Sequence, residues 1–564
     1  MIMVEHAERE RKSVYEAPSE RACVLALAAS TITWCAFVVA SARMTSHPIV
    51  LADEAAYLLP TLLGPSAENY ARWGIIPQIP DLLYYWIYGT FAGSNLYSLA
   101  KSLNAAFIVG AVVPIYMVMR AYLPSREAAV FAMVVICAPI SSFARYFMPE
   151  SLYFFGFWWT IYLFLVTLRQ SMLSAGLATG VGLGLLSLVK PHALMLVVGI
   201  GLFFLLRPGR PRERLLPSVA LVLSYYGVHV GVGRVLGRIW DFSVTGAVYG
   251  GQLSISRFEA SALLLNALGH FASLMLLAGL PLAAIVAALV RGHRQASHQP
   301  RDLMLLALCT LGATAVITVY YSHSVYLIDP SGKQMTRLHG RYYTYVLPLV
   351  MLAYIELARV CREPPALFSN LALLTFGTGT LLALYLVSRV YETSIVDYPE
   401  LSILAKWPRG ISVAAVSSAA LLLSARILRG ARFRPGLSRR ALPVVWWATI
   451  MLSTSLLLLA GPLTGRWLKP KDIDRVMESD PTLRALRQHD DGMVVGTPEA
   501  APDTYRVMFY LASRSRGRML GPKKVLGPSA IPDDVNWLIL LQGASYAGPG
   551  EHVVIGPLTL VKLR

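Results

Sequence analysis

Residues 22–57 read ACVLALAASTITWCAFVVASARMTSHPIVLADEAAY. The first part, residues 22–42, contains no charged side chain and has about the 20 residues that an α-helix needs to cross a bilayer. An acidic pair, Asp53 and Glu54, follows after a short connection. This succession predicts a membrane-spanning helix whose far end leads directly to two adjacent carboxylates.

The composition extends this prediction to the whole chain. Of its 564 residues, 55% are hydrophobic and 15% are charged, and the mean hydropathy is +0.54. These values exceed what a water-soluble core requires, so membrane lipid is the expected surrounding for most of the chain. The formal net charge of +18 does not predict a nucleic-acid partner, because the Lys and Arg residues cluster between apolar segments.

Apolar segments of roughly spanning length recur about thirteen times. The first ends in Ala-Ser-Ala, as a cleaved signal peptide can, but its full spanning length and the many spans after it favour an uncleaved anchor. The predicted spans are residues 22–42, 101–122, 128–145, 151–168, 173–189, 193–206, 215–235, 262–290, 303–321, 342–357, 367–387, 411–428 and 441–463.

The basic residues predict which side of the membrane each loop faces. If residues 1–21 are cytoplasmic, every second loop is rich in Lys and Arg, as the positive-inside rule requires. The C-terminus then lies outside the cytoplasm. The segments predicted to face outward are 43–100, 237–261, 322–341, 388–410 and the tail from 465.

Two outward segments have structure of their own. Residues 53–63 and 81–91 are amphipathic and too short to span, which predicts helices lying on the outer interface. The tail combines a charged helix-like stretch, 472–489, with strand-like runs and Pro/Gly turns, and therefore predicts a small α/β domain. The predicted strands are 493–496, 537–541, 552–555 and 558–562, and the predicted domains are 1–21, 22–464 and 465–564.

Asp53 and Glu54 have two interpretations. Adjacent carboxylates at the start of an amphipathic helix can serve as an N-cap and a first-turn acid, and on position alone this is as good an explanation as catalysis. A carboxylate at the lipid–water boundary is partly desolvated, however, which raises its basicity toward that of a general base.

Cationic side chains are predicted on the same outward side. Lys190 and His192 lie between two apolar spans that leave no room for a long loop, and ionisable groups at that depth are commonly functional, although lysines also snorkel to the surface. Arg145 and Glu150 flank another outward junction, where snorkelling is the alternative explanation. The loop before the tenth span carries a basic and phenolic run that invites an anionic ligand: Lys333, Arg337, His339, Arg341, Tyr342 and Tyr343.

Several other sites are not predicted. The five cysteines show no CxxC or metal-like spacing, and no HExxH or phosphate-binding glycine loop occurs. Gly176, Gly180 and Gly184 predict a smooth helix face for close packing. No cofactor is therefore predicted. A divalent cation beside Asp53 and Glu54 is compatible with their chemistry, but adjacent residues alone supply too few ligands to define a metal site.

The arrangement resembles the GT-C superfamily of membrane glycosyltransferases, which includes protein O-mannosyltransferases and the aminoarabinose transferases that act on lipid A. Asp53-Glu54-Ala55-Ala56-Tyr57 matches the Asp-Glu-x-x-Tyr form of the family's first-loop motif. Residues 77–104 resemble its usual continuation, with Ile-Pro-Asp-Leu in place of the customary Pro-Pro-Leu, and residues 145–150 resemble a second signature.

This resemblance implies a mainly α, polytopic bundle of the GT-C type in the bacterial cytoplasmic membrane. It implies an inverting transfer of a sugar from a polyprenyl-phosphate donor to a cell-envelope glycolipid, polysaccharide or protein on the outer face. Asp53 is then the general base and Glu54 positions it or the acceptor. The donor phosphate would be bound by Lys190, His192 and Arg341, with Arg145 and His339 as further candidates, and supported by Glu150, Tyr57 and Tyr342.

Other functional classes compete with this interpretation. A lipid or glycolipid transporter or flippase would use its buried charges to line a path, but such proteins usually show internal repeats and charges near the membrane midplane. An oligosaccharide ligase or polymerase would use a diphosphate-linked donor and would lack the acidic motif in the first loop. A structural scaffold would tolerate the loss of every charged residue named above.

Overall fold

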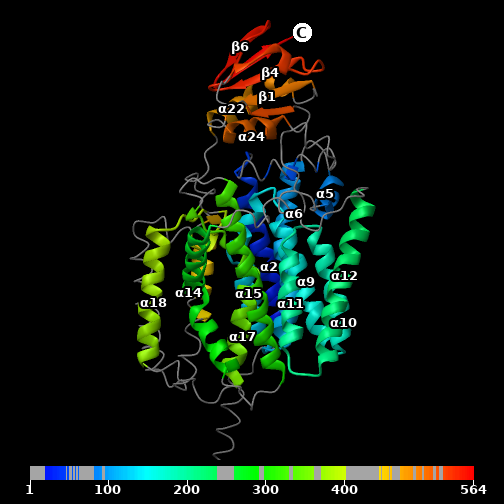
Figure 1. Ribbon diagram of the computed structural model, residues 1–564, viewed down its shortest axis with the longest axis vertical. Helices are drawn as coiled ribbons and strands as arrows, with labels where there is room; N and C mark the ends of the chain where they lie inside the picture. The colour runs from blue at the N-terminus through cyan, green and yellow to red at the C-terminus, as the bar shows by residue number, and fades with distance from the viewer. Residues whose placement is uncertain are drawn as a thin grey trace, which may run out of the picture.

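The structure is a computed structural model in which long helices form a bundle and a small α/β domain stands on one end of it (Figure 1). We call this end of the bundle the domain end; the C-terminus lies at the tip of the α/β domain. The structure describes residues 20–45, 47–49, 54, 57–58, 61, 82–91, 96–237, 259–290, 298–328, 335–360, 370–394, 396–401, 444–445, 447–456, 458–459, 471–486, 491–497, 501–511, 516–519 and 525–563.

The first helices of the bundle pack around α2 (Glu20–Arg43), the helix predicted from the opening stretch. Helix α6 (Leu96–Gly110) continues into α7 (Val112–Arg120), and α8 (Ser125–Ile136) is followed by the 3-10 helix η1 (Pro139–Arg145). The axes of α8 and η1 differ by 46°, because Pro139 cannot continue the α-helical hydrogen bonding. Residues 146–149 then connect η1 to α9 (Glu150–Leu168).

Helices α10 (Met172–Ser187) and α12 (Pro211–Gly237) approach each other closely along a glycine face. A Cβ atom added to Gly176 would lie 2.3 Å from the carbonyl oxygen of Pro217, and one added to Gly180 would lie 2.4 Å from that of Leu221. No side chain larger than hydrogen fits at these two positions without moving backbone. The predicted packing role of Gly176, Gly180 and Gly184 is confirmed.

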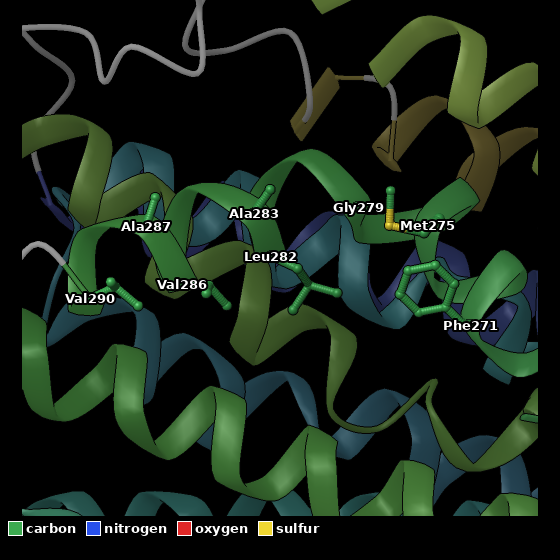
Figure 2. Close-up of a pocket in the computed structure, with 8 residues that line it drawn as sticks. All are labelled: Phe271, Met275, Gly279, Leu282, Ala283, Val286, Ala287 and Val290. Atoms are coloured by element: carbon green, nitrogen blue, oxygen red, sulfur yellow. The ribbon is translucent and has the colours of Figure 1, made fainter. Parts of the chain in front are cut away.

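The remaining described helices complete the bundle: α11 (Ala193–Leu206), α14 (Ala260–Val290), α15 (His298–Ile328), α17 (Leu347–Val360) and α18 (Asn370–Arg389). An open hollow of about 530 Å³ lies along α14, and Figure 2 shows the apolar side chains that line it. No ionisable group occurs among the described residues of this lining, so the hollow is suited to hydrocarbon and not to catalysis. The lining residues are Phe271, Met275, Gly279, Leu282, Ala283, Val286, Ala287 and Val290.

Six helices in the described part of the chain are long and apolar enough to cross a membrane, and a seventh span results if α8 and η1 are counted together. Helices α10 and α11 are apolar but shorter. The predicted span 411–428 lies outside the described residues, and 441–463 lies only partly within them. The chain is therefore a membrane protein in its described part, while the total of about thirteen spans and their sidedness stay predictions. The spanning helices are Glu20–Arg43, Leu96–Arg120, Glu150–Leu168, Pro211–Leu236, Ala260–Val290 and Pro300–Ser324.

Of the two predicted interfacial helices, the second forms as α5 (Leu82–Gly89), which lies at the domain end (Figure 1). In the first, Glu54, Tyr57, Leu58 and Thr61 are the described residues, and all four are helical.

The C-terminal domain contains a five-stranded sheet in the order β2-β1-β4-β7-β6. Strand β1 pairs in parallel with β2 and β4, and β7 pairs antiparallel with β4 and β6. The four predicted strands correspond to β1, β4, β6 and β7. The strands are β1 (Gly492–Gly496), β2 (Arg516–Met519), β4 (Trp537–Leu541), β6 (Glu551–Ile555) and β7 (Leu558–Lys562), and a separate pair is β3 (Val525–Leu526) with β5 (Ser545–Tyr546).

The predicted helix 472–489 is wrong in one respect, because two helices form, α22 (Asp472–Ser479) and α23 (Pro481–Leu486). Asp480 between them has an extended backbone, which the following Pro481 favours. Helices α22 and α24 (Ala501–Tyr510) lie between the sheet and the bundle (Figure 1). Their buried apolar side chains belong to the same continuous core as those of the bundle.

Candidate functional site

The candidate site lies at the domain end, where residues 145–150 connect η1 to α9. Arg145 ends η1 and Glu150 begins α9, and both side chains are almost completely buried. A carboxylate in the first turn of a helix is favoured by the helix dipole, which accounts for Glu150 at this position. The connection touches two polar clusters, one around Glu54 and one around Lys190.

Glu54 holds three separate segments together. Its side chain has no exposed surface. One carboxylate oxygen accepts a hydrogen bond from the amide of Ile49 at 2.7 Å, and the other accepts from the Tyr97 hydroxyl at 2.8 Å and the Phe147 amide at 2.9 Å. Its hydrogen bonds to the Ile49 and Phe147 amides join the backbone of two segments that lie far apart in the chain. These contacts suit a positioning role. Asp53 lies outside the described residues, and its role stays a prediction.

Helix α6 contributes polar residues to this cluster that the sequence interpretation missed. The Lys101 ammonium donates to the Thr45 carbonyl and lies 4.0 Å from the centre of the Tyr97 ring. Asn104 accepts from the Tyr88 hydroxyl and donates to the Tyr146 carbonyl at 2.7 Å. The available signal was helical periodicity, because residues 97, 101 and 104 recur at spacings of four and three and therefore share one face.

Tyr57, a predicted supporting residue, is buried near Glu54 in the chain but belongs to the aromatic packing. Its ring meets that of Tyr84 edge to face, with centroids 5.6 Å apart, and Tyr84 stacks on Tyr88 at 4.3 Å. These rings pack around Phe147, which donates its amide to Glu54. Tyr57 thus supports the wall of the site.

The second cluster consists of one carboxylate between two cations. The Lys190 ammonium forms an ion pair with Glu150, and the Arg341 guanidinium lies 3.6 Å from the same carboxylate oxygen. Lys190, Glu150 and Arg341 are 2%, 0% and 7% exposed, respectively. Burying charges is costly unless they are paired, and here two positive charges share one negative charge. Among the described residues, one carboxylate thus faces two cations, which is an arrangement suited to an anionic ligand.

Tyr342 covers this cluster. The Lys190 ammonium and the Arg341 guanidinium lie 5.2 Å and 5.4 Å from the centre of its ring, within the range of cation–π attraction. The His192 ring stacks on Tyr342 with centroids 4.1 Å apart. His192 and Tyr342 also line a cavity of about 20 Å³, which is room for one water molecule. The predicted residues Glu150, Lys190, His192, Arg341 and Tyr342 are thus brought together.

His339 lies in the same loop as Arg341, but its imidazole is engaged elsewhere. Its Nδ1 atom lies 2.9 Å from the Ser322 hydroxyl, which in turn lies 3.1 Å from Nε2 of His270. Burial lowers the pKa of His339 to about 4, and the charges of Arg337 and Arg341 act in the same direction against that of Asp397. At neutral pH the ring is uncharged, so it can meet a phosphate only as a hydrogen-bonding group.

Arg145 does not join the Lys190 cluster. It is 1% exposed, and its Nε atom donates to the Ser142 carbonyl at 3.4 Å. Its guanidinium lies 5.9 Å from the Tyr146 ring and forms no ion pair among the described residues. Since Tyr146 also accepts from Asn104, Arg145 lies on the Glu54 side of the connection. Arg145 is thus a further buried cation, beside Lys101 on the Glu54 side.

A second loop holds the one that carries Arg341. The Arg337 guanidinium pairs with Asp397 at 2.6 Å, and the Arg341 amide donates to the Asp397 carbonyl at 2.6 Å. Leu338 and Thr336 exchange backbone hydrogen bonds with Glu392. The sequence places the second loop in the outward segment 388–410 but does not predict this pairing, because contacts between loops that are distant in the chain leave no periodic pattern.

The two clusters are close. Phe147 binds Glu54 and Glu150 binds Lys190, and the three residues from one to the other span at most about 11 Å of extended chain. No group of three or more His, Cys, Asp or Glu side chains suited to a metal occurs within the described ranges, which exclude Asp53. Lys333 also lies outside them.

Comparison with known proteins found no matching protein-family model and no similar curated sequence. One solved structure similar to the chain is that of the Archaeoglobus fulgidus oligosaccharyltransferase, tethered to an acceptor peptide by a disulfide bond. The two are 12% identical, with a TM-score of 0.36, over 89% of this chain. The chain spans 64% of the length of that protein.

Proposed function

We propose that the chain is a membrane glycosyltransferase that moves a sugar from a polyprenyl-phosphate donor to a cell-envelope acceptor at the domain end of the bundle. The observation that supports this most is the pairing of two chemistries within one short connection. Glu54, the described residue of the acidic motif, is held by three hydrogen bonds, and in the described part of the chain Glu150 faces two buried cations. Glycosyl transfer from a lipid phosphate needs a proton acceptor and a site for the leaving anion near each other.

In the proposed reaction, the Asp53 carboxylate takes the proton of a hydroxyl group on the acceptor. The oxygen of this acceptor hydroxyl attacks the anomeric carbon of the donor sugar. The bond between that carbon and the phosphate oxygen breaks, and its electron pair leaves on the lipid phosphate. A single displacement inverts the configuration. Glu54 is proposed to position Asp53, because its carboxylate accepts from the Ile49 amide just before the motif and joins this loop to Tyr97 and Phe147.

Lys190 and Arg341 would meet the negative charge that develops on the leaving phosphate. Glu150 holds both cations while the donor is absent and thereby keeps them in place for it. Tyr342 and His192 limit access of water to this charge because their stacked rings cover the cluster. Arg145 is available to an anionic part of either substrate.

The test uses purified full-length protein in proteoliposomes. The donors are radiolabelled hexoses and pentoses linked to polyprenyl phosphate or to polyprenyl diphosphate, and the acceptors are membrane glycolipids and wall glycans. We expect Asp53→Asn to lower turnover by about 100-fold or more, as loss of a general base does. Lys190→Met should lower it by about 100-fold because one donor to the leaving phosphate is lost. Arg475→Gln, at an exposed position on α22, is the control.

Three outcomes would contradict the proposal. Asp53→Asn at the wild-type rate would remove the base assignment. Movement of the labelled lipid across the bilayer without a new glycosidic bond would establish a flippase. Turnover confined to diphosphate-linked donors would establish a ligase or polymerase.

A further inference from the structure

The loop that connects α2 to the acidic motif is held by side chains from several elements. Lys101 donates to the Thr45 carbonyl, and the Tyr97 hydroxyl, which donates to Glu54, also lies 3.2 Å from the His47 carbonyl oxygen. The amide of Ile49 donates to Glu54 at 2.7 Å. All these partners belong to the membrane domain. The Pro48 carbonyl lies between the His47 and Ile49 contacts and is approached by a donor from a different domain.

This donor is Arg506 on α24 of the C-terminal domain. Its Nη1 atom lies 3.4 Å from the Pro48 carbonyl oxygen, more than 450 residues away in the chain. The same atom lies 2.7 Å and 2.5 Å from the two carboxylate oxygens of Asp474 on α22. Arg506 is 6% exposed and Asp474 is 0% exposed, so this is a buried ion pair at the junction of the two domains.

Asp474 is also held by contacts other than the one with Arg506. Its carboxylate accepts from the Lys471 amide at 2.8 Å in the capping box of α22, and Lys471 in turn pairs with Asp503 at 3.2 Å. Asp503 also lies 3.9 Å from Nε of Arg506. The guanidinium is therefore held from two sides within the C-terminal domain and directs one nitrogen at the loop below.

We infer that Arg506 is a positioning residue for the acidic motif: it links the C-terminal domain to Pro48 and, through the adjacent Ile49 amide, to Glu54. The inference rests on the proposed function, because it assigns the C-terminal domain a part in the same reaction. Loss of the link frees the loop and with it the carboxylates, while Lys190 and Arg341 keep their contacts with Glu150. The expected effect is on turnover and not on donor binding.

The test compares Arg506→Gln with wild-type protein, full length and in lipid nanodiscs. Hydrogen exchange is followed in peptides covering residues 45–52 and residues 537–541, the latter being β4. We expect exchange at the Ile49 amide to accelerate about 10-fold, with β4 unchanged. For transfer from polyprenyl-phosphate sugar, kcat should fall about 10-fold and the donor KM should change less than about 2-fold. Arg506→Lys, which keeps the charge, should restore part of both losses.

Two controls make the result decisive. Arg475→Gln removes an exposed arginine from α22 and should change neither readout, whereas Glu54→Ala should accelerate exchange at Ile49 because it removes the oxygen that accepts from this amide. If Arg506→Gln leaves Ile49 exchange unchanged while Glu54→Ala raises it, or if β4 exchange rises as much as that of Ile49, the inference is wrong. Exchange needs no substrate, so a chain without transferase activity whose Ile49 amide still responds to Arg506→Gln would refute the proposed function and retain the link.

Discussion

Glu150 is a carboxylate that two buried cations share, so it bears on stability as well as on function. Glu150→Gln removes this counter-ion from Lys190 and Arg341, and breaking a buried pair in this way costs about 3–5 kcal/mol. We expect a large drop in the melting temperature measured in detergent. The control is Glu356→Gln, because that carboxylate pairs with the more exposed Arg359 at 3.8 Å and should matter little. Equal melting temperatures for the two variants would contradict the assignment.

A second buried carboxyl group, Glu400, predicts a dependence of stability on pH. Glu400 accepts from the Thr344 hydroxyl in the loop beside Arg341, and burial raises its pKa to about 7 in spite of that bond. The unfolded chain has the lower, ordinary pKa, so the contribution of the neutral group is complete below about pH 4.5 and is lost as the pH rises through 7. At pH 8 the loss is on the order of 3 kcal/mol.

Glu400→Gln keeps the hydrogen bond and cannot ionise. We expect it to melt at a higher temperature than the wild type at pH 8 and at about the same temperature at pH 4.5. A difference between the two proteins that does not change with pH would show that Glu400 is not the titrating group.

At the scale of elements, the contact of α10 with α12 predicts an intolerance to added volume. An alanine Cβ at Gly180 would lie 1.9 Å from the Ser224 hydroxyl and 2.4 Å from the Leu221 carbonyl oxygen, and the latter is backbone that cannot rotate away. We expect Gly180→Ala to cost about 1–3 kcal/mol through overpacking. Gly201→Ala on α11 meets nothing within 4 Å and should be neutral or stabilising by up to about 1 kcal/mol. Thermal unfolding of both variants provides the comparison, and equal effects would refute close packing.

The elements also show how far the sequence could lead. Spanning helices such as α2 and α9 were predictable because apolar length is set by bilayer thickness. The glycine face of α10 was predictable because its period matches the helix. The break at Pro481 was available in the sequence but was overlooked. The position of Glu150 between Lys190 and Arg341 was not available, because a shared membrane face does not say which side chains touch.

At the scale of the whole molecule, the C-terminal domain and the bundle share one apolar core, so the domain packs against the end of the bundle that carries the site. We call this packed arrangement the seated state. His47 lies buried at this junction, and burial lowers its pKa. The neighbouring Asp474 and Glu478 oppose this shift, whereas Arg506 and Lys101 add to it. The seated state therefore holds His47 neutral.

A neutral buried histidine makes seating of the domain sensitive to acid. The pKa of His47 is lower when the C-terminal domain contacts the bundle than when the two are apart, so protonation favours their separation. The contribution of neutral His47 to this contact is therefore complete above about pH 6.5 and is lost as the pH falls toward the lowered pKa. We expect hydrogen exchange in residues 45–52 and 501–511 to accelerate between pH 7 and pH 5, after correction for the intrinsic rate, and the change to be smaller in His47→Gln. His552→Gln, at an exposed position on β6, should behave like the wild type. An acid response that survives His47→Gln in full would assign the sensitivity to another group at the junction.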